Sequence, residues 1–144
     1  MLNKISIYTD GSYDYKRNIS AYAVVVVNKR IIVDIIKRKT DKDYNLRNTY
    51  CELAAIMEAV KYAKSKNSHA ILYYDYKGIN KLLKKYKKIE NIKNIKNSFI
   101  REYVKFMLEN EKYYSFCRIS RNSNIYHQTA HHSAREMIDI ENMA

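Results

Sequence analysis

The sequence predicts an α/β fold: a five-stranded mixed sheet with helices on both faces. Three β-rich runs come first, at residues 4–8, 20–27 and 30–36, and no helical periodicity separates them. Helical patterns and short apolar runs then alternate along the rest of the chain. Three successive strands favour an antiparallel meander, and a later strand–helix–strand crossover adds parallel strands to the same sheet.

Turn signals and residue spacing set the first elements. The strand at residues 4–8 runs into Thr9-Asp10-Gly11-Ser12, a turn signal, so we expect Asp10 at the strand end. Residues 28–29, Asn-Lys, are a two-residue hairpin candidate between the second and third strands. A helix follows, and its apolar residues recur at helical spacing: Leu53, Ile56, Met57, Val60 and Ala63.

The second half of the chain alternates between strand and helix patterns. Residues 70–74 predict a buried strand that Asp75 terminates, and residues 113–119 predict the last strand. Residues 77–96 read as a lysine-rich helix, and residues 99–108 as an amphipathic one. Apolar residues mark a closing helix at Ala130, Ala134, Met137 and Ile138.

Length and charge restrict the function classes. At 144 residues we expect one domain, residues 1–144. Lys and Arg number 27 and Asp and Glu 15, which leaves a net charge of +12. Such a surplus favours a polyanionic partner, because each neutralised phosphate releases counterions. The alternative is compositional bias, since Lys, Asn, Ile and Tyr all have AT-rich codons.

Cysteine content and hydropathy bear on the compartment. The two cysteines, Cys51 and Cys117, are too few for a disulfide framework and fit a reducing compartment. The sequence begins without a signal-peptide pattern, and its longest apolar run, residues 21–27, has the length of a strand. We therefore expect a monomeric cytoplasmic protein with no membrane partner.

Three acidic residues stand where the predicted layout brings them together. Asp10 ends the first strand, Glu52 lies at the start of the first helix, and Asp75 ends the fourth strand. Acids at the ends of neighbouring parallel strands point into one crevice, where they repel one another unless a cation is bound. Oxygen ligands with open coordination positions suit two Mg²⁺ or Mn²⁺ ions, which can cleave a phosphodiester.

Each acid also has a structural interpretation. Asp10 before Gly11 is a common turn pair. Thr49-x-x-Glu52 matches a capping box, in which Glu52 would satisfy N–H groups at the helix start. Asp75 could be an exposed strand-end acid. A separate structural explanation for each of the three acids is less plausible than one metal site that they share.

Three segments resemble the motifs of type 1 ribonucleases H. Residues 7–12 (Ile-Tyr-Thr-Asp-Gly-Ser) are similar to the first motif and residues 48–56 to the second. Residues 71–79 (Ile-Leu-Tyr-Tyr-Asp-Tyr-Lys-Gly-Ile) are similar to the third, most closely to the version in bacterial members related to viroplasmin. The resemblance spans residues 4–138. It implies the ribonuclease H-like fold, two divalent ions on Asp10, Glu52 and Asp75, and hydrolysis of the RNA strand of an RNA–DNA hybrid.

The fourth motif departs from the family pattern. Within residues 127–135, His127 stands at the usual Asn and His131 at the usual Asp, so the resemblance implies His131 as the fourth catalytic and metal-binding residue. A nitrogen ligand shifts preference from Mg²⁺ toward Mn²⁺. Alternatively, the two histidines, four residues apart on one helical face, chelate a metal themselves or form a solvated polar face. Arg121 replaces the loop histidine that is thought to assist turnover, and it cannot shuttle a proton.

Substrate contacts are expected near the motifs and along the lysine tract. In related enzymes a basic helix near this tract grips DNA phosphates, and Asn48 and Thr49 would lie near the minor groove, where the 2′-hydroxyl distinguishes RNA. A solvated helix face is the alternative for the lysines. The substrate-binding residues that we expect are Gly11, Ser12, Asn48, Thr49, Lys84, Lys85, Lys87, Lys88 and Arg121.

The sequence thus predicts a ribonuclease H whose products carry 5′-phosphate and 3′-hydroxyl ends. Two alternatives remain open. The changes at Arg121, His127 and His131 could leave a non-catalytic module that binds hybrids or duplexes. A nuclease of the same fold could instead act on DNA or double-stranded RNA.

Overall fold

The computed structural model describes residues 2–40, 42–86, 89–120 and 124–139. Within them a five-stranded sheet runs in the order β3-β2-β1-β4-β5. The strands are β1 (Asn3–Asp14), β2 (Ile19–Asn28), β3 (Ile31–Thr40), β4 (Ser68–Tyr74) and β5 (Tyr114–Arg118). β1, β2 and β3 pair antiparallel, whereas β4 is parallel to both β1 and β5. The predicted mixed sheet is confirmed.

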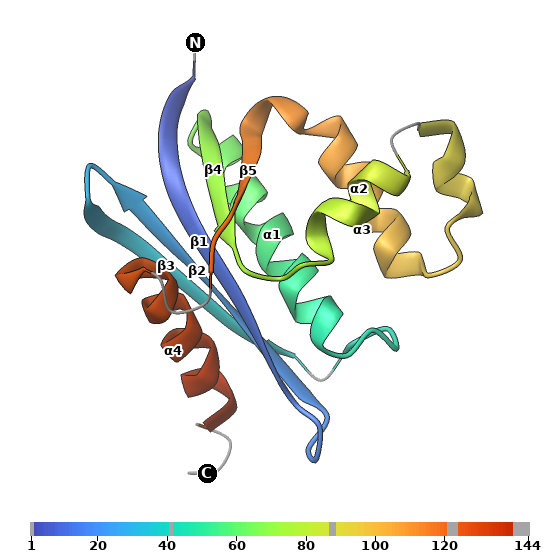
Figure 1. Cartoon of the computed structure of the whole chain (residues 1–144), viewed down its shortest axis with the longest axis horizontal. Helices are drawn as coiled ribbons and strands as arrows, with labels where there is room; N and C mark the ends of the chain where they lie inside the picture. Colours follow the sequence, from blue (N-terminus) through green and yellow to red (C-terminus); the bar gives the residue numbers. More distant parts are fainter. Residues whose placement is uncertain (1, 41, 87–88, 121–123, 140–144) are drawn as a thin grey trace.

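Helices cover both faces of the sheet (Figure 1). One side carries α1 (Asn48–Ser65), with α2 (Ile79–Lys85) and α3 (Ser98–Glu109) beyond it, and the other side carries α4 (Ile125–Asp139). No helix in the described ranges has the length and apolar character needed to cross a membrane.

The alternation of side chains along β2 supplies both cores. Val24 and Val26 point to the α1 side, where they join the larger cluster, while Ala23, Val25 and Val27 point to α4. A strand buried on both faces reads as a continuous apolar run, which explains the sequence of residues 21–27. β3 forms the sheet edge and is mostly exposed.

Two predicted boundaries near the first strands are wrong. β1 does not end near Tyr8 but continues to Asp14, because β2 pairs with it as far as Asp14 and Ile19. Its parallel pairing with β4 does stop at Tyr8 and Tyr73. The second hairpin turns at Lys29–Arg30, one residue later than predicted, and both residues have positive φ (51° and 67°), as a type I′ turn requires.

The lysine tract is not one helix. It contains α2 and a separate 3-10 helix (Ile89–Asn94), and residues 87–88 lie outside the described residues. Asparagine has low helix propensity and favours caps. Accordingly, Asn97 N-caps α3, its side chain accepting hydrogen bonds from the N–H groups of Phe99 and Ile100.

Candidate active site

A cleft of about 830 Å³ opens where β1 continues past its pairing with β4. Its lining comes from β1 and the turn after it, the start of α1, the segment after β4, and α4. These residues are Asp10, Gly11, Ser12, Tyr13, Tyr15, Asn48, Glu52, Asp75, Tyr76, Lys77, His131 and Arg135. The three predicted acids therefore share one cleft.

Asp10 lines the cleft and is 3% exposed. Because β1 continues beyond it, Asp10 sits within the antiparallel pairing with β2, opposite Ala23, and just beyond the last parallel pair with β4. Burial raises the pKa of Asp10, and the nearby charge of Asp75 raises it further, while a hydrogen bond from His131 opposes both effects. A bound cation would favour the ionised form.

Glu52 connects α1 to β1. Its Oε1 accepts a hydrogen bond from the backbone N–H of Gly11 at 3.1 Å, and the side chain is buried. The capping-box interpretation of Glu52 is wrong, because α1 starts after Arg47 without a side-chain cap, and the Thr49 hydroxyl instead contacts the Tyr76 hydroxyl at 2.6 Å. The Glu52 carboxylate thus serves the cleft rather than the helix start.

Gly11 allows this close approach of helix and strand. A Cβ at position 11 would lie 2.7 Å from the Cys51 Sγ and 3.0 Å from the backbone nitrogen of Glu52. Both distances are below ordinary van der Waals contact. Gly11 is therefore needed for space.

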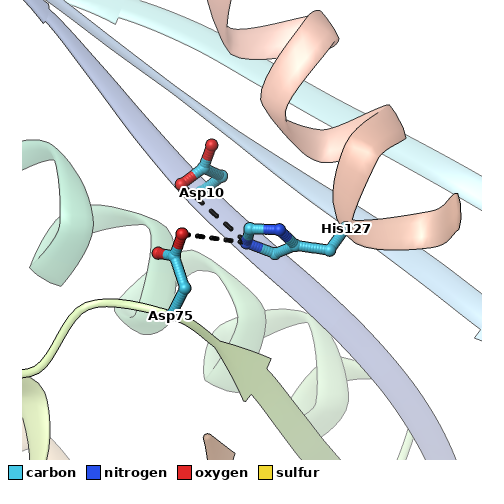
Figure 2. A group of neighbouring side chains, drawn as sticks. All are labelled: Asp10, Asp75 and His127. Atoms are coloured by element: carbon cyan, nitrogen blue, oxygen red, sulfur yellow. Dashed lines mark ion pairs between the residues drawn. The ribbon is translucent and has the colours of Figure 1, made fainter. Parts of the chain in front are cut away.

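Asp75 directly follows β4, as predicted, and it faces a histidine from α4 (Figure 2). The Nε2 atom of His127 lies 3.9 Å from Asp10 Oδ1 and 3.9 Å from Asp75 Oδ2. His127 is 1% exposed, and neither of its ring nitrogens makes a hydrogen bond to any of the described residues. This buried ring brings a nitrogen atom close to both carboxylates.

His131, one helical turn further along α4, holds the other side of Asp10. Its Nδ1 and the Asp10 Oδ2 form a hydrogen bond of 2.8 Å, and its side chain is 28% exposed. Each of the two histidines thus contacts Asp10, so they belong to the same site as the acids and not to a separate two-histidine site.

The donor set fits a divalent cation. Ligand atoms of Asp10, Asp75 and His127 all lie within 4.8 Å of one another, and the first two residues line the open cleft. Asp10 is buried and Asp75 is half-buried, and two carboxylates this close repel each other unless a positive charge lies between them. The buried His127 ring has no hydrogen-bond partner among the described residues, so its lone pair is free to bind a cation. A cation would interact favourably with the carboxylates and with the ring.

Sequence comparison defines the family. A family model for RNase H matches residues 2–139. The chain belongs to the RNase H family. No curated protein matches the chain.

Solved RNase H structures share the fold. RNase H1 from the halophilic archaeon Halobacterium salinarum superposes with a TM-score of 0.72 at 17% identity, covering 96% of this chain and 99% of that one. The N-terminal RNase H domain of a Mycobacterium tuberculosis protein gives 0.71 at 15% identity, with 99% of each chain covered. LC11-RNase H1, solved with an RNA/DNA hybrid, gives 0.66 at 15% identity, with 93% and 99% covered. At such identities the likeness concerns the fold.

The other residues expected to contact substrate in this RNase H fall into three groups. Gly11, Ser12 and Asn48 line the cleft, and Thr49 reaches it through Tyr76. Lys84 and Lys85 are exposed in the last turn of α2 and are not among the lining residues. Lys87, Lys88 and Arg121 lie outside the described residues.

One site residue was assigned no role from the RNase H motifs. His127 occupies the usual Asn position, and its distance of four residues from His131 was the available signal. That spacing places both rings on one face of α4. Only the packing of α4 against β1 and β2 shows that this face turns toward the acids.

Proposed function

We propose that this chain is a divalent-metal-dependent endoribonuclease that cuts the RNA strand of RNA–DNA hybrids. The observation that carries the proposal is that ligand atoms of Asp10, Asp75 and His127 lie within 4.8 Å of one another beside an open cleft that both acids line, in a chain of the RNase H family. Carboxylates this close repel each other unless a cation lies between them. The cluster therefore supports metal-assisted chemistry over a purely structural role.

Each residue of the site has a distinct task. Asp10 and Asp75, with His127, would hold a divalent ion, and Glu52 keeps its carboxylate at the same cleft through Gly11. His131 fixes the orientation of the Asp10 carboxylate through their hydrogen bond. When bound, divalent ions supply an activated water and stabilise the leaving 3′ oxygen, giving 5′-phosphate products.

Substrate choice would come from the cleft walls and the overall charge. Ser12 and Asn48 line the cleft and can meet a 2′-hydroxyl, the group that separates RNA from DNA. Lys84 and Lys85 are exposed and can neutralise phosphates, consistent with the net charge of +12. The RNA/DNA hybrid in the LC11-RNase H1 structure supports the same substrate class here.

A panel of end-labelled substrates tests the proposal. The panel contains an RNA–DNA hybrid, double-stranded RNA, double-stranded DNA and single-stranded RNA of one sequence, each with Mg²⁺, Mn²⁺ or EDTA. We expect metal-dependent cutting of the hybrid RNA strand, with products that polynucleotide kinase labels only after phosphatase treatment. Hybrid binding without cutting would instead establish a non-catalytic module. Preferential cutting of another duplex would establish a nuclease with that substrate.

A further inference from the structure

The two histidines of α4 contact Asp10 in different ways. His131 Nδ1 already forms a hydrogen bond of 2.8 Å with Asp10 Oδ2. His127 Nε2 lies 3.9 Å from a carboxylate oxygen on each side, beyond the roughly 3.2 Å at which N–H···O bonds end. One ring is therefore bonded to an acid, whereas the other faces two acids without bonding to either.

The His127 ring is almost fully shielded from bulk solvent. The ring is 1% exposed, and among the described residues neither nitrogen finds a hydrogen-bond partner. Buried polar side chains without partners are rare in native proteins, and a bound ion is one of the explanations for them. The Nε2 atom, directed between Asp10 and Asp75, is suitably placed to bind a cation there (Figure 2).

We infer that His127, and not His131, is the nitrogen ligand of the metal site, and that His131 is a positioning residue for Asp10. The inference depends on the proposed function only for the premise that this cleft takes a divalent ion. It reverses the roles that the motif resemblance implies, in which His131 at the usual Asp position binds metal.

The chemistry of the ligands determines which ion is preferred. Mg²⁺ is a hard ion that prefers oxygen, whereas imidazole favours first-row transition ions. One nitrogen among the ligands should therefore raise the affinity for Mn²⁺ relative to Mg²⁺. Removing His127 should lower this preference, while removing a residue that only orients Asp10 should weaken both ions in similar proportion.

Binding of Mn²⁺ to the protein without nucleic acid tests the assignment directly. Electron spin-echo modulation detects a directly bound ¹⁴N, and free Mn²⁺ measured by its EPR signal gives the affinity, with Mg²⁺ affinity from competition. Three glutamine variants are compared with wild type: His127→Gln, His131→Gln, and His132→Gln as the matched control. His132 is exposed on the same helix, next to His131, and does not line the cleft.

Nitrogen modulation is expected in the wild type, in His131→Gln and in His132→Gln, and its loss is expected only in His127→Gln. His127→Gln should weaken Mn²⁺ binding by at least about tenfold, because even the loss of a residue that only hydrogen-bonds to a metal ligand lowers metal affinity by about that factor. It should also lower the ratio of Mn²⁺ affinity to Mg²⁺ affinity. His131→Gln should weaken both ions and keep the ratio. If His127→Gln does not fold, as judged by circular dichroism, His127→Asn takes its place.

Two results would overturn the inference. Modulation that disappears in His131→Gln and persists in His127→Gln would make His131 the ligand. Wild-type Mn²⁺ without nitrogen modulation would mean that only oxygen binds the ion. Hybrid cleavage is measured separately. If the wild type cuts hybrids but shows no nitrogen modulation, only this inference is refuted. If it shows the expected modulation but cuts no hybrid, only the proposed function is refuted.

Discussion

Replacing Gly11 by alanine tests the contact between β1 and α1 on which the cleft depends. The new Cβ would lie 2.7 Å from Cys51 Sγ, 3.0 Å from the Glu52 backbone nitrogen and 3.1 Å from the Cys51 carbonyl carbon. Two of these three atoms belong to the helix backbone, so no change of rotamer relieves them. The helix must move away from the strand, and the hydrogen bond from Gly11 N–H to Glu52 must lengthen.

The expected loss in the free energy of unfolding is about 1–3 kcal/mol, the usual range for overpacking a buried site. In a domain of this size that corresponds to a fall in Tm of roughly 3–10 °C. Because Glu52 moves with the helix, metal affinity should fall as well. Thermal and urea unfolding followed by circular dichroism give the stability, and Mn²⁺ titration gives the affinity.

Gly78→Ala is the matched control within the chain. The three atoms nearest to a Cβ at Gly78 all belong to the Tyr76 side chain, the closest at 2.9 Å, and a side chain can shift by a few tenths of an ångström where helix backbone cannot. We expect a loss below about 1 kcal/mol. Adding Cys51→Ala to Gly11→Ala removes the closest contact but leaves the two backbone contacts, so it should restore only part of the stability. Equal losses of unfolding free energy in Gly11→Ala and Gly78→Ala would refute the close approach of β1 to α1. Complete recovery of stability on adding Cys51→Ala would show that the Cys51 side chain, and not the helix backbone, causes the clash.

Three further predictions concern the charge, a helix cap and the basic surface. Burial raises the pKa of Asp10, so ionisation of this carboxyl destabilises the metal-free fold as the pH rises from about 3.8, the ordinary pKa of Asp. Without metal, Asp10→Asn should therefore raise Tm at pH 7, and this gain should vanish below about pH 3.8. A constant difference in Tm across this pH range would contradict that reasoning. Asn97→Ala removes the acceptor that caps α3 and should cost about 0.5–2 kcal/mol in urea unfolding, whereas an unchanged midpoint would mean that the cap contributes nothing. Removing both Lys84 and Lys85 by alanine substitution should lower the slope of log affinity for a hybrid against log salt by up to about 2, and an unchanged slope would place the phosphates elsewhere.

The fold was largely predictable because the apolar pattern is consistent at several levels. The continuous apolar run of β2 indicates a strand buried on both faces, and both faces are indeed covered. The end of β1 was not predictable, because Thr9-Asp10-Gly11-Ser12 has the composition of a turn. β1 continues through this segment because it pairs with the long β2. Such pairing depends on both strands and cannot be inferred from the sequence of one.

The site was predictable to the extent that its residues occur in recognisable segments. Asp10, Glu52 and Asp75 stand in such segments and line one cleft. The different contacts of His127 and His131 could not be read from the sequence, because both lie on the same face of α4. Because of the way α4 packs against β1, Nε2 of His127 faces both Asp10 and Asp75, whereas Nδ1 of His131 faces Asp10.

Cleavage of the hybrid by Asp10→Asn is the most direct test of the central claim. Asparagine keeps the size of the side chain but removes the charge that, in this account, holds the divalent ion. We predict a folded variant that binds an RNA–DNA hybrid with near wild-type affinity and has lost cleavage in both Mg²⁺ and Mn²⁺. Wild-type cleavage rates in Asp10→Asn would contradict the account, since the site built around Asp10 would then not be where the RNA strand is cut.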